Sequence, residues 1–164
     1  MTIADNSLAV GLGEIKVSHS ALDVLVAYGL GSCVGVGFYD PVKRVAGLLH
    51  AVLPERVNGN DPVLGKYVDT GIQQLLAEVE ALGAVRSRLI VRMAGGANML
   101  LSQGVSMSFN IGERNVARAQ MTLKALSFKI AAQEVGGNAG RTVRLYVVDG
   151  RMTVRVLGNQ EREI

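Results

Sequence analysis

The sequence is poor in the residues that build metal centres and nucleic-acid interfaces. Among its 164 residues there are one cysteine, two histidines and no tryptophan, and aromatic residues make up only 4% of the chain. Such a set does not supply the ligands that a zinc site needs, so we predict no metal. Net charge is only +3 and the basic residues are scattered. Without a basic stripe and aromatic side chains for base stacking, a nucleic-acid partner is not expected.

Long apolar runs are also absent. No stretch of about 18 apolar residues could cross a membrane, and residues 1–10 lack the basic start and apolar core of a signal peptide. We therefore expect a cytoplasmic protein without membrane insertion, in which a lone thiol stays reduced. With 49% hydrophobic residues, the chain has the size and apolar content of a single domain, residues 1–164, with a substantial core.

Eight apolar runs, each bounded by Gly, Pro, Asn or Asp, predict β-strands. They are residues 10–17, 22–27, 33–39, 45–53, 89–94, 130–135, 143–148 and 152–157. Asp149-Gly150, between the last two runs, predicts a type I′ hairpin turn. Four arginines are expected on the solvent face of that hairpin: Arg141, Arg144, Arg151 and Arg155.

Two segments between these runs have helical periodicity. Apolar residues repeat at helical spacing over 65–82, and Gly83 stands where a glycine would end that helix. A second stripe covers 113–128, with Asn110 or Gly112 as the start. Strands at both ends with helices between them predict an α+β fold or a layered α/β sandwich whose helices cover a sheet.

The most informative residue is Cys33, which closes the glycine-bracketed turn 29–33 at the mouth of a predicted strand. His50 lies in the next predicted strand. If Asp40-Pro41-Val42-Lys43 forms a four-residue hairpin loop, as its Asp-Pro pair favours, Cys33 and His50 face each other directly. Opposed residues have Cβ atoms about 4.5–5.5 Å apart on one sheet face, which suits a nucleophile and its base. The alternatives are that Cys33 is only a small buried hydrophobic residue and that His50 is an ordinary histidine of the core.

Glycines surround Cys33, and their missing side chains favour a shallow slot over a packed core. They are Gly29, Gly31, Gly35 and Gly37. The backbone amides of Gly31, Ser32 and Cys33 could form an anion-binding nest that holds an oxyanion. A dinucleotide fingerprint would need glycine at position 34, where Val34 stands, so no cofactor is expected.

Three further glycine-containing turns, at 95–98, 110–112 and 136–138, could gather at one end of the sheet and wall a pocket. Methionine and phenylalanine side chains nearby would give a flexible apolar surface for a partner helix. We expect the substrate or partner face to contain Gly95, Gly96, Met99 and Phe109, with Met93 and Met107 close by. Simple core packing is the alternative for each.

Six ordered blocks carry a family resemblance that runs nearly end to end. They are Leu30-Gly31-Ser32-Cys33-Val34; Asp40-Pro41 followed by His50 and Leu53-Pro54; Lys66-Tyr67 with Asp69-Thr70; Ala94-Gly95-Gly96-Ala97; Asn110-Ile111-Gly112 with Arg114-Asn115; and Gly136-Gly137-Asn138. In these blocks the chain resembles the CheD family of chemoreceptor glutamine deamidases.

The resemblance implies a three-layer α/β sandwich in which Cys33 is the nucleophile and His50 the base. It implies conversion of selected glutamines to glutamate on the helical bundle of chemoreceptors, and by analogy hydrolysis of glutamyl methyl esters. It also implies a second partner, a CheC-like phosphatase, that competes with receptors for the active-site face.

The chain departs from the family pattern at one position. The third catalytic member of the family is a threonine shortly before the cysteine, and here Ala27 stands in its place. Alanine cannot accept a hydrogen bond, so the orientation of His50 falls to a backbone carbonyl or another hydroxyl, with Ser18 and Ser20 as weak candidates. The deamidase has two rivals. One is a non-catalytic module that binds receptor or phosphatase, which Ala27 supports; the other is a cysteine hydrolase of small amides, which fits the chemistry but not the end-to-end resemblance.

Overall fold

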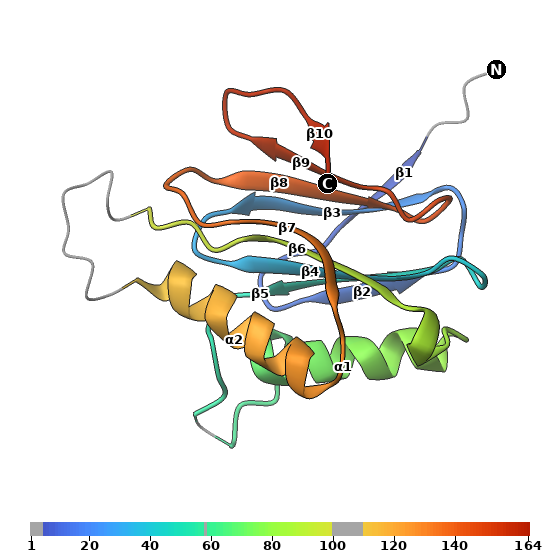
Figure 1. Ribbon diagram of the computed structural model, residues 1–164, viewed down its shortest axis with the longest axis horizontal. Helices are drawn as coiled ribbons and strands as arrows, with labels where there is room; N and C mark the ends of the chain where they lie inside the picture. Colours follow the sequence, from blue (N-terminus) through green and yellow to red (C-terminus); the bar gives the residue numbers. More distant parts are fainter. Residues whose placement is uncertain (1–4, 58, 100–109) are drawn as a thin grey trace.

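The computed structural model describes residues 5–57, 59–99 and 110–164, which form two mixed sheets and a helical layer (Figure 1). Sheet A has the order β1 (Asn6–Ala9), β3 (Asp23–Leu30), β8 (Arg141–Tyr146), β9 (Met152–Val156) and β10 (Arg162–Glu163). Sheet B has the order β2 (Ile15–Ser18), β5 (Val45–Ala51), β4 (Val34–Asp40), β6 (Ile90–Gly95) and β7 (Ile130–Val135). The helical layer contains α1 (Val68–Ala81) and α2 (Ile111–Ala125), with the short turns η1 (Leu64–Lys66) and η2 (Arg86–Arg88) beside it. The predicted three-layer α/β sandwich is confirmed.

Sheet B is the middle layer and is covered on both faces, and every residue of β4 and β5 is buried. Side chains on one face of the sheet, such as Phe38 of β4 and Leu49 of β5, form a core with Leu75 of α1 in the helical layer. Side chains on the opposite face, such as Leu48 of β5, form a second core with Leu145 of β8 in sheet A. Burying each such side chain stabilises the fold by about 1.5–3 kcal/mol, so the two apolar layers hold β4 and β5 in place.

Both predicted helices are present, with shifted ends. The first begins at Val68 after η1, and Gly83 follows it with a positive φ of 108°. The second is capped by Asn110, whose side chain accepts a hydrogen bond from the Glu113 amide at 3.0 Å. Neither α1 nor α2 has the length and apolar character needed to cross a bilayer.

One strand prediction and one turn prediction are wrong in detail. The run 10–17 is interrupted by a turn at 11–14, because Gly13 adopts a φ of +75° and the chain passes from sheet A to sheet B there. The type I′ turn at Asp149-Gly150 is absent, since only Gly150 of that pair has a positive φ. The loop is longer because Val147 leaves the β8–β9 pairing, donates its amide hydrogen to the Asp23 carbonyl at 3.1 Å and is buried between the sheets.

The β4–β5 hairpin differs from the predicted register by two residues. Asp40 is the last paired residue of β4 and lies opposite Val45, so the loop spans 41–44. Its Oδ1 accepts the amide hydrogens of Val42 and Lys43, at 2.9 and 3.1 Å, and Arg44 has a positive φ of 53°. As a result, His50 lies opposite Gly35 and not opposite Cys33.

Asp40 anchors this hairpin to the rest of the chain. Its carboxylate is fully buried and accepts hydrogen bonds from the Arg88 guanidinium, at 2.8 Å, and from the Val85 amide, also at 2.8 Å. Burial alone would raise the pKa of Asp40, but the hydrogen bonds from Arg88 and the backbone amides outweigh it and hold the pKa well below its usual range.

We predict that Asp40→Asn destabilises the fold by about 1–3 kcal/mol at pH 7, because the amide leaves buried donors without their charged acceptor. A group with a depressed folded-state pKa stabilises above its unfolded pKa and loses that contribution as the pH falls. The difference in free energy of unfolding between parent and variant should therefore be largest at pH 7. It should shrink as the pH falls below 3.8, the ordinary pKa of an aspartate. Urea denaturation at several pH values measures it, with Asp149→Asn as the matched control. Equal stability of parent and Asp40→Asn at pH 7 would contradict the anchoring role.

Candidate active site

Cys33 and His50 share the face of sheet B that meets sheet A. Cys33 directly precedes β4, is 9% exposed and belongs to the core between the sheets. His50 is 2% exposed and faces Gly35, two residues beyond Cys33. The prediction of direct opposition is therefore wrong, but a shift of two residues keeps both side chains on one face. Diagonal neighbours of this kind are about 7–8 Å apart, within reach of an imidazole ring.

A backbone carbonyl orients the ring of His50. Nδ1 lies 2.9 Å from the carbonyl oxygen of Val10. Because a carbonyl can only accept, Nδ1 carries the hydrogen and Nε2 presents a lone pair. Nε2 is buried and has no hydrogen-bond partner within 5–57, 59–99 and 110–164. This confirms the carbonyl alternative for the orientation of His50. Ser18 is not the orienting group, since Nδ1 bonds to Val10 and Nε2 has no partner among the described residues; the Ser18 hydroxyl instead donates to Asp23 at 2.5 Å.

Burial shifts both side chains toward their neutral forms. It raises the pKa of the Cys33 thiol, partly offset by the backbone N–H of Cys33 itself. Burial lowers the pKa of His50, partly offset by the hydrogen bond to Val10 and the charge of Glu14. A neutral thiol and a neutral imidazole therefore coexist near pH 7, and a thiolate requires that the proton be removed during reaction.

The turn that carries Cys33 is held by the segment 95–97. The Ala97 amide donates to the Gly31 carbonyl and the Gly96 amide to the Cys33 carbonyl, both at 2.8 Å. Gly95 has a φ of +113°, and a Cβ there would lie 2.3 Å from the Cys33 carbonyl oxygen. Only glycine therefore permits this close approach.

Three of the four residues predicted for the partner face lie beside this turn. Gly95 and Gly96 contact it through their backbone, and a Cβ on Gly31 would be 3.2 Å from the side chain of Met99. Met99 is exposed. Phe109, like Met107, lies outside the described residues. The structure thus brings Gly95, Gly96 and Met99 together with Cys33.

The predicted slot over the β4 glycines is absent. A Cβ on Gly37 would lie 2.3 Å from Met152 and 3.3 Å from Leu145, both in sheet A. A Cβ on Gly35 would lie 3.1 Å from Leu30. These two glycines therefore make room for the packing of sheet A and not for a ligand.

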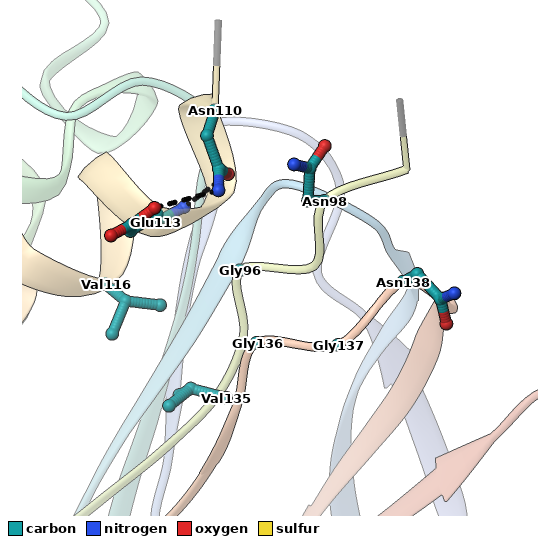
Figure 2. Close-up of a pocket in the computed structure, with 9 residues that line it drawn as sticks. All are labelled: Gly96, Asn98, Asn110, Glu113, Val116, Val135, Gly136, Gly137 and Asn138. Atoms are coloured by element: carbon teal, nitrogen blue, oxygen red, sulfur yellow. Dashed lines mark hydrogen bonds between the residues drawn. The ribbon is translucent and has the colours of Figure 1, made fainter. Parts of the chain in front are cut away.

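The three other glycine-containing turns do gather around one cavity, of about 520 Å³ (Figure 2). The backbone N–H of Asn98 donates to the Gly137 carbonyl at 2.8 Å, and this bond joins two of the turns. The cavity is lined by Gly96, Asn98, Asn110, Glu113, Val116, Val135, Gly136, Gly137 and Asn138. Cys33 and His50 are not in its wall, and Gly96 is the residue that borders both the cavity and the Cys33 turn.

Arg141 was expected on the solvent face, and this prediction is wrong. The residue is 6% exposed. Its guanidinium donates to the carbonyls of Gly95, at 2.7 Å, and Glu134, at 2.9 Å, and also to that of Gly136. These bonds join the ends of β6 and β7, and the Gly95 carbonyl also accepts the Gly136 amide hydrogen at 3.0 Å. Arg141 therefore cross-links the turns next to Cys33.

Sequence reasoning assigned no role to Asn115, which is fully buried on α2. Its Nδ2 donates to the carbonyls of Ser32 and Val52, both at 2.9 Å. A sequence signal for Asn115 exists: it is the one polar side chain among the buried positions of α2, where the others are Gly112, Ala119 and Leu123.

Comparison with known proteins shows the family of this chain. A family model described as CheD chemotactic sensory transduction matches residues 52–156. A protein named as a probable chemoreceptor glutamine deamidase CheD from Symbiobacterium thermophilum is 43% identical, covering 95% of this chain and 96% of its own length. Proteins of the same name from Caldanaerobacter subterraneus subsp. tengcongensis and Pyrococcus abyssi are 45% and 44% identical, each covering 93% of this chain and 94% of its own length. The chain belongs to the CheD family.

The match to the CheD family model begins at residue 52, after Cys33 and His50. The alignment with the relative from Symbiobacterium thermophilum extends further. It covers 95% of this chain and therefore includes both Cys33 and His50. The site therefore lies within the region shared with CheD proteins.

We predict that Cys33 reacts with iodoacetamide slowly at pH 7, and that its rate rises with pH to a midpoint above the ordinary thiol value of 9.0, because burial disfavours the thiolate. Mass spectrometry of the alkylated peptide measures the rate. Protein unfolded in urea is the control and should show the ordinary midpoint. A folded-state midpoint below that of the unfolded chain would contradict the neutral resting thiol.

Proposed function

We propose that this chain converts selected glutamine side chains of chemoreceptors to glutamate, with Cys33 as the nucleophile and His50 as the base. The names of the CheD relatives support the substrate class. The observation that carries the proposal is the state of His50. Its Nδ1 is held by the Val10 carbonyl, and its bare Nε2 is buried on the same sheet face as the Cys33 thiol. A thiol nucleophile needs a base with a free lone pair, and His50 offers one on the face that Cys33 occupies. The two side chains are not hydrogen-bonded to each other in the free protein, so we propose that they close up when substrate binds.

In the first half of the reaction, Nε2 of His50 takes the thiol proton as the sulfur of Cys33 attacks the carboxamide carbon of glutamine. The resulting oxyanion lies against backbone amides of the turn 31–33. The C–N bond then breaks, and His50 returns the proton to the departing ammonia. The product of this half is a thioester between Cys33 and the receptor side chain.

In the second half, His50 takes a proton from water, and the resulting hydroxide attacks the thioester carbon. The C–S bond breaks, and the proton on His50 returns to the sulfur. Glutamate is left on an intact receptor, and the neutral pair is restored. A glutamyl methyl ester would follow the same path with methanol as the leaving group, so we include esterase activity in the proposal.

The receptor helix is proposed to lie over the segment 95–99, with Gly95 and Gly96 at the turn and Met99 and Phe109 as apolar contacts. Cys33 is nearly buried, so a glutamine side chain must extend from its helix to reach the sulfur. A CheC-like phosphatase is proposed to compete for the same face. Competition follows directly if both partners cover the segment 95–99.

The main rival is a non-catalytic binding module, which was favoured by Ala27 in place of the family threonine. The hydrogen bond from His50 to the Val10 carbonyl supplies the orientation that the threonine would give. Because that bond removes the reason for doubting catalysis, we favour the enzyme.

We predict that Cys33→Ala abolishes deamidation of receptor cytoplasmic fragments while receptor binding is kept. His50→Asn should lower the rate by about 10²–10⁴-fold, because its amide can still donate to the Val10 carbonyl but offers no base in place of Nε2. Peptide mass spectrometry of amide-to-acid conversion measures both effects. Conversion at the parental rate by Cys33→Ala would rule out the nucleophile. A parent protein that binds receptor but converts no glutamine would establish the binding module instead.

We also predict that Ala27→Thr brings no increase in rate, because Val10 already holds Nδ1 at 2.9 Å. Ala27 is fully buried, so the larger side chain should destabilise the fold by about 1–3 kcal/mol. Deamidation assays and thermal melts measure the two effects. A clear gain in rate for Ala27→Thr would show that the carbonyl does not orient His50 well enough for catalysis.

A further inference from the structure

A single buried amide joins the two segments that carry Cys33 and His50. Nδ2 of Asn115 donates to the carbonyl of Ser32, immediately before Cys33, and to that of Val52, two residues after His50. Both acceptors are carbonyls, so the side-chain nitrogen must be the atom that faces them. Asn115 thus approaches the site from the helical layer, on the side of sheet B opposite to the thiol.

The bond to Ser32 determines where the amide of Cys33 points. The Ser32 carbonyl and the Cys33 N–H belong to one planar trans peptide unit, so they point in opposite directions. Because the carbonyl is turned toward Asn115, the N–H is turned away from α2. The Cys33 N–H is also the group that favours the thiolate of its own side chain.

Three successive carbonyls of this turn are held, but by different means. Backbone amides of Ala97 and Gly96 hold the carbonyls of Gly31 and Cys33. The carbonyl between them, that of Ser32, is held by the side chain of Asn115. Substitution of Asn115 can therefore release the middle peptide while the flanking backbone bonds remain.

Helix packing alone does not account for an asparagine at this position. The neighbouring buried positions of α2 are Gly112, Ala119 and Leu123, and an apolar residue would fit such a stripe. Asn115 is fully buried, and its Oδ1 has no hydrogen-bond partner among the described residues. A buried polar atom without a partner is costly, so a role beyond packing is indicated.

We propose that Asn115 is a positioning residue that holds the Ser32–Cys33 peptide so that the Cys33 N–H faces the oxyanion formed on the substrate carbonyl. The effect on turnover rests on the proposed deamidase function, whereas the effect on the thiol of the free protein does not. Asn115 itself touches neither the sulfur nor the substrate.

The test compares Asn115→Leu, which has a similar volume but no donor, with the parent. We expect kcat for receptor deamidation to fall about tenfold to a hundredfold with KM little changed, because the oxyanion donor is misplaced only in the transition state. In the free protein, the pH midpoint of Cys33 alkylation should move upward. The matched control is Leu123→Ala, at a buried position of the same helix eight residues beyond Asn115. It should lower the melting temperature and leave both kcat and the midpoint unchanged.

The proposal is overturned if Asn115→Leu keeps the parental kcat and midpoint, or if Leu123→Ala reproduces both changes at an equal loss of stability. Should Asn115→Leu fail to fold, Asn115→Ala, which is smaller and also lacks a donor, decides by the same criteria. If the parent deamidates no receptor glutamine, the proposed function fails, and the alkylation midpoint alone then decides the role of Asn115.

Discussion

The structure depends on the burial of β4 and β5 on both faces, between sheet A and the helical layer. Strands in this position have apolar side chains of both parities, so polar chemistry is confined to the places where the strands enter or leave the sheet. Cys33 stands at such an entry, and His50 is the penultimate residue of β5. The turns at 95–97 and 136–137, Arg141 and Asn115 all serve the same end of the sheet, where carbonyls leave the regular ladder and need other donors.

The same burial explains why the layers could be predicted from the sequence and the register could not. Helical periodicity and apolar runs identify the elements, but two apolar faces give no signal that distinguishes one even shift from another. Asp40 resembled a loop residue because it precedes proline. It is instead a buried strand residue, paired with Arg88 far along the chain, and no local pattern shows such a partner. The predicted shared face survived because an error of two residues preserves parity.

For the candidate site, the sequence draws attention to side chains with rare chemistry and gives no sign of the backbone groups that contact them. Cys33 and His50 stood out as the lone thiol and a histidine in an apolar run, but the Val10 carbonyl that orients His50 carries no sequence signal. The glycines near Cys33 could not be assigned a role from the sequence. Gly95 allows the backbone of the Cys33 turn to approach closely, whereas Gly37 makes room for the side chain of Met152 in sheet A. Buried polar residues inside regular elements, such as Asn115, gave the signal that local reasoning overlooked.

The neutral resting state of the thiol also bears on how the protein survives oxidants. Peroxides and disulfides react with thiolates, and low-pKa exposed cysteines are the ones that oxidise first. Cys33 is nearly buried and its pKa is raised, so the free protein holds it in the form that such reagents attack least. The burial that disfavours ionisation of Cys33 therefore also protects its thiol from oxidation.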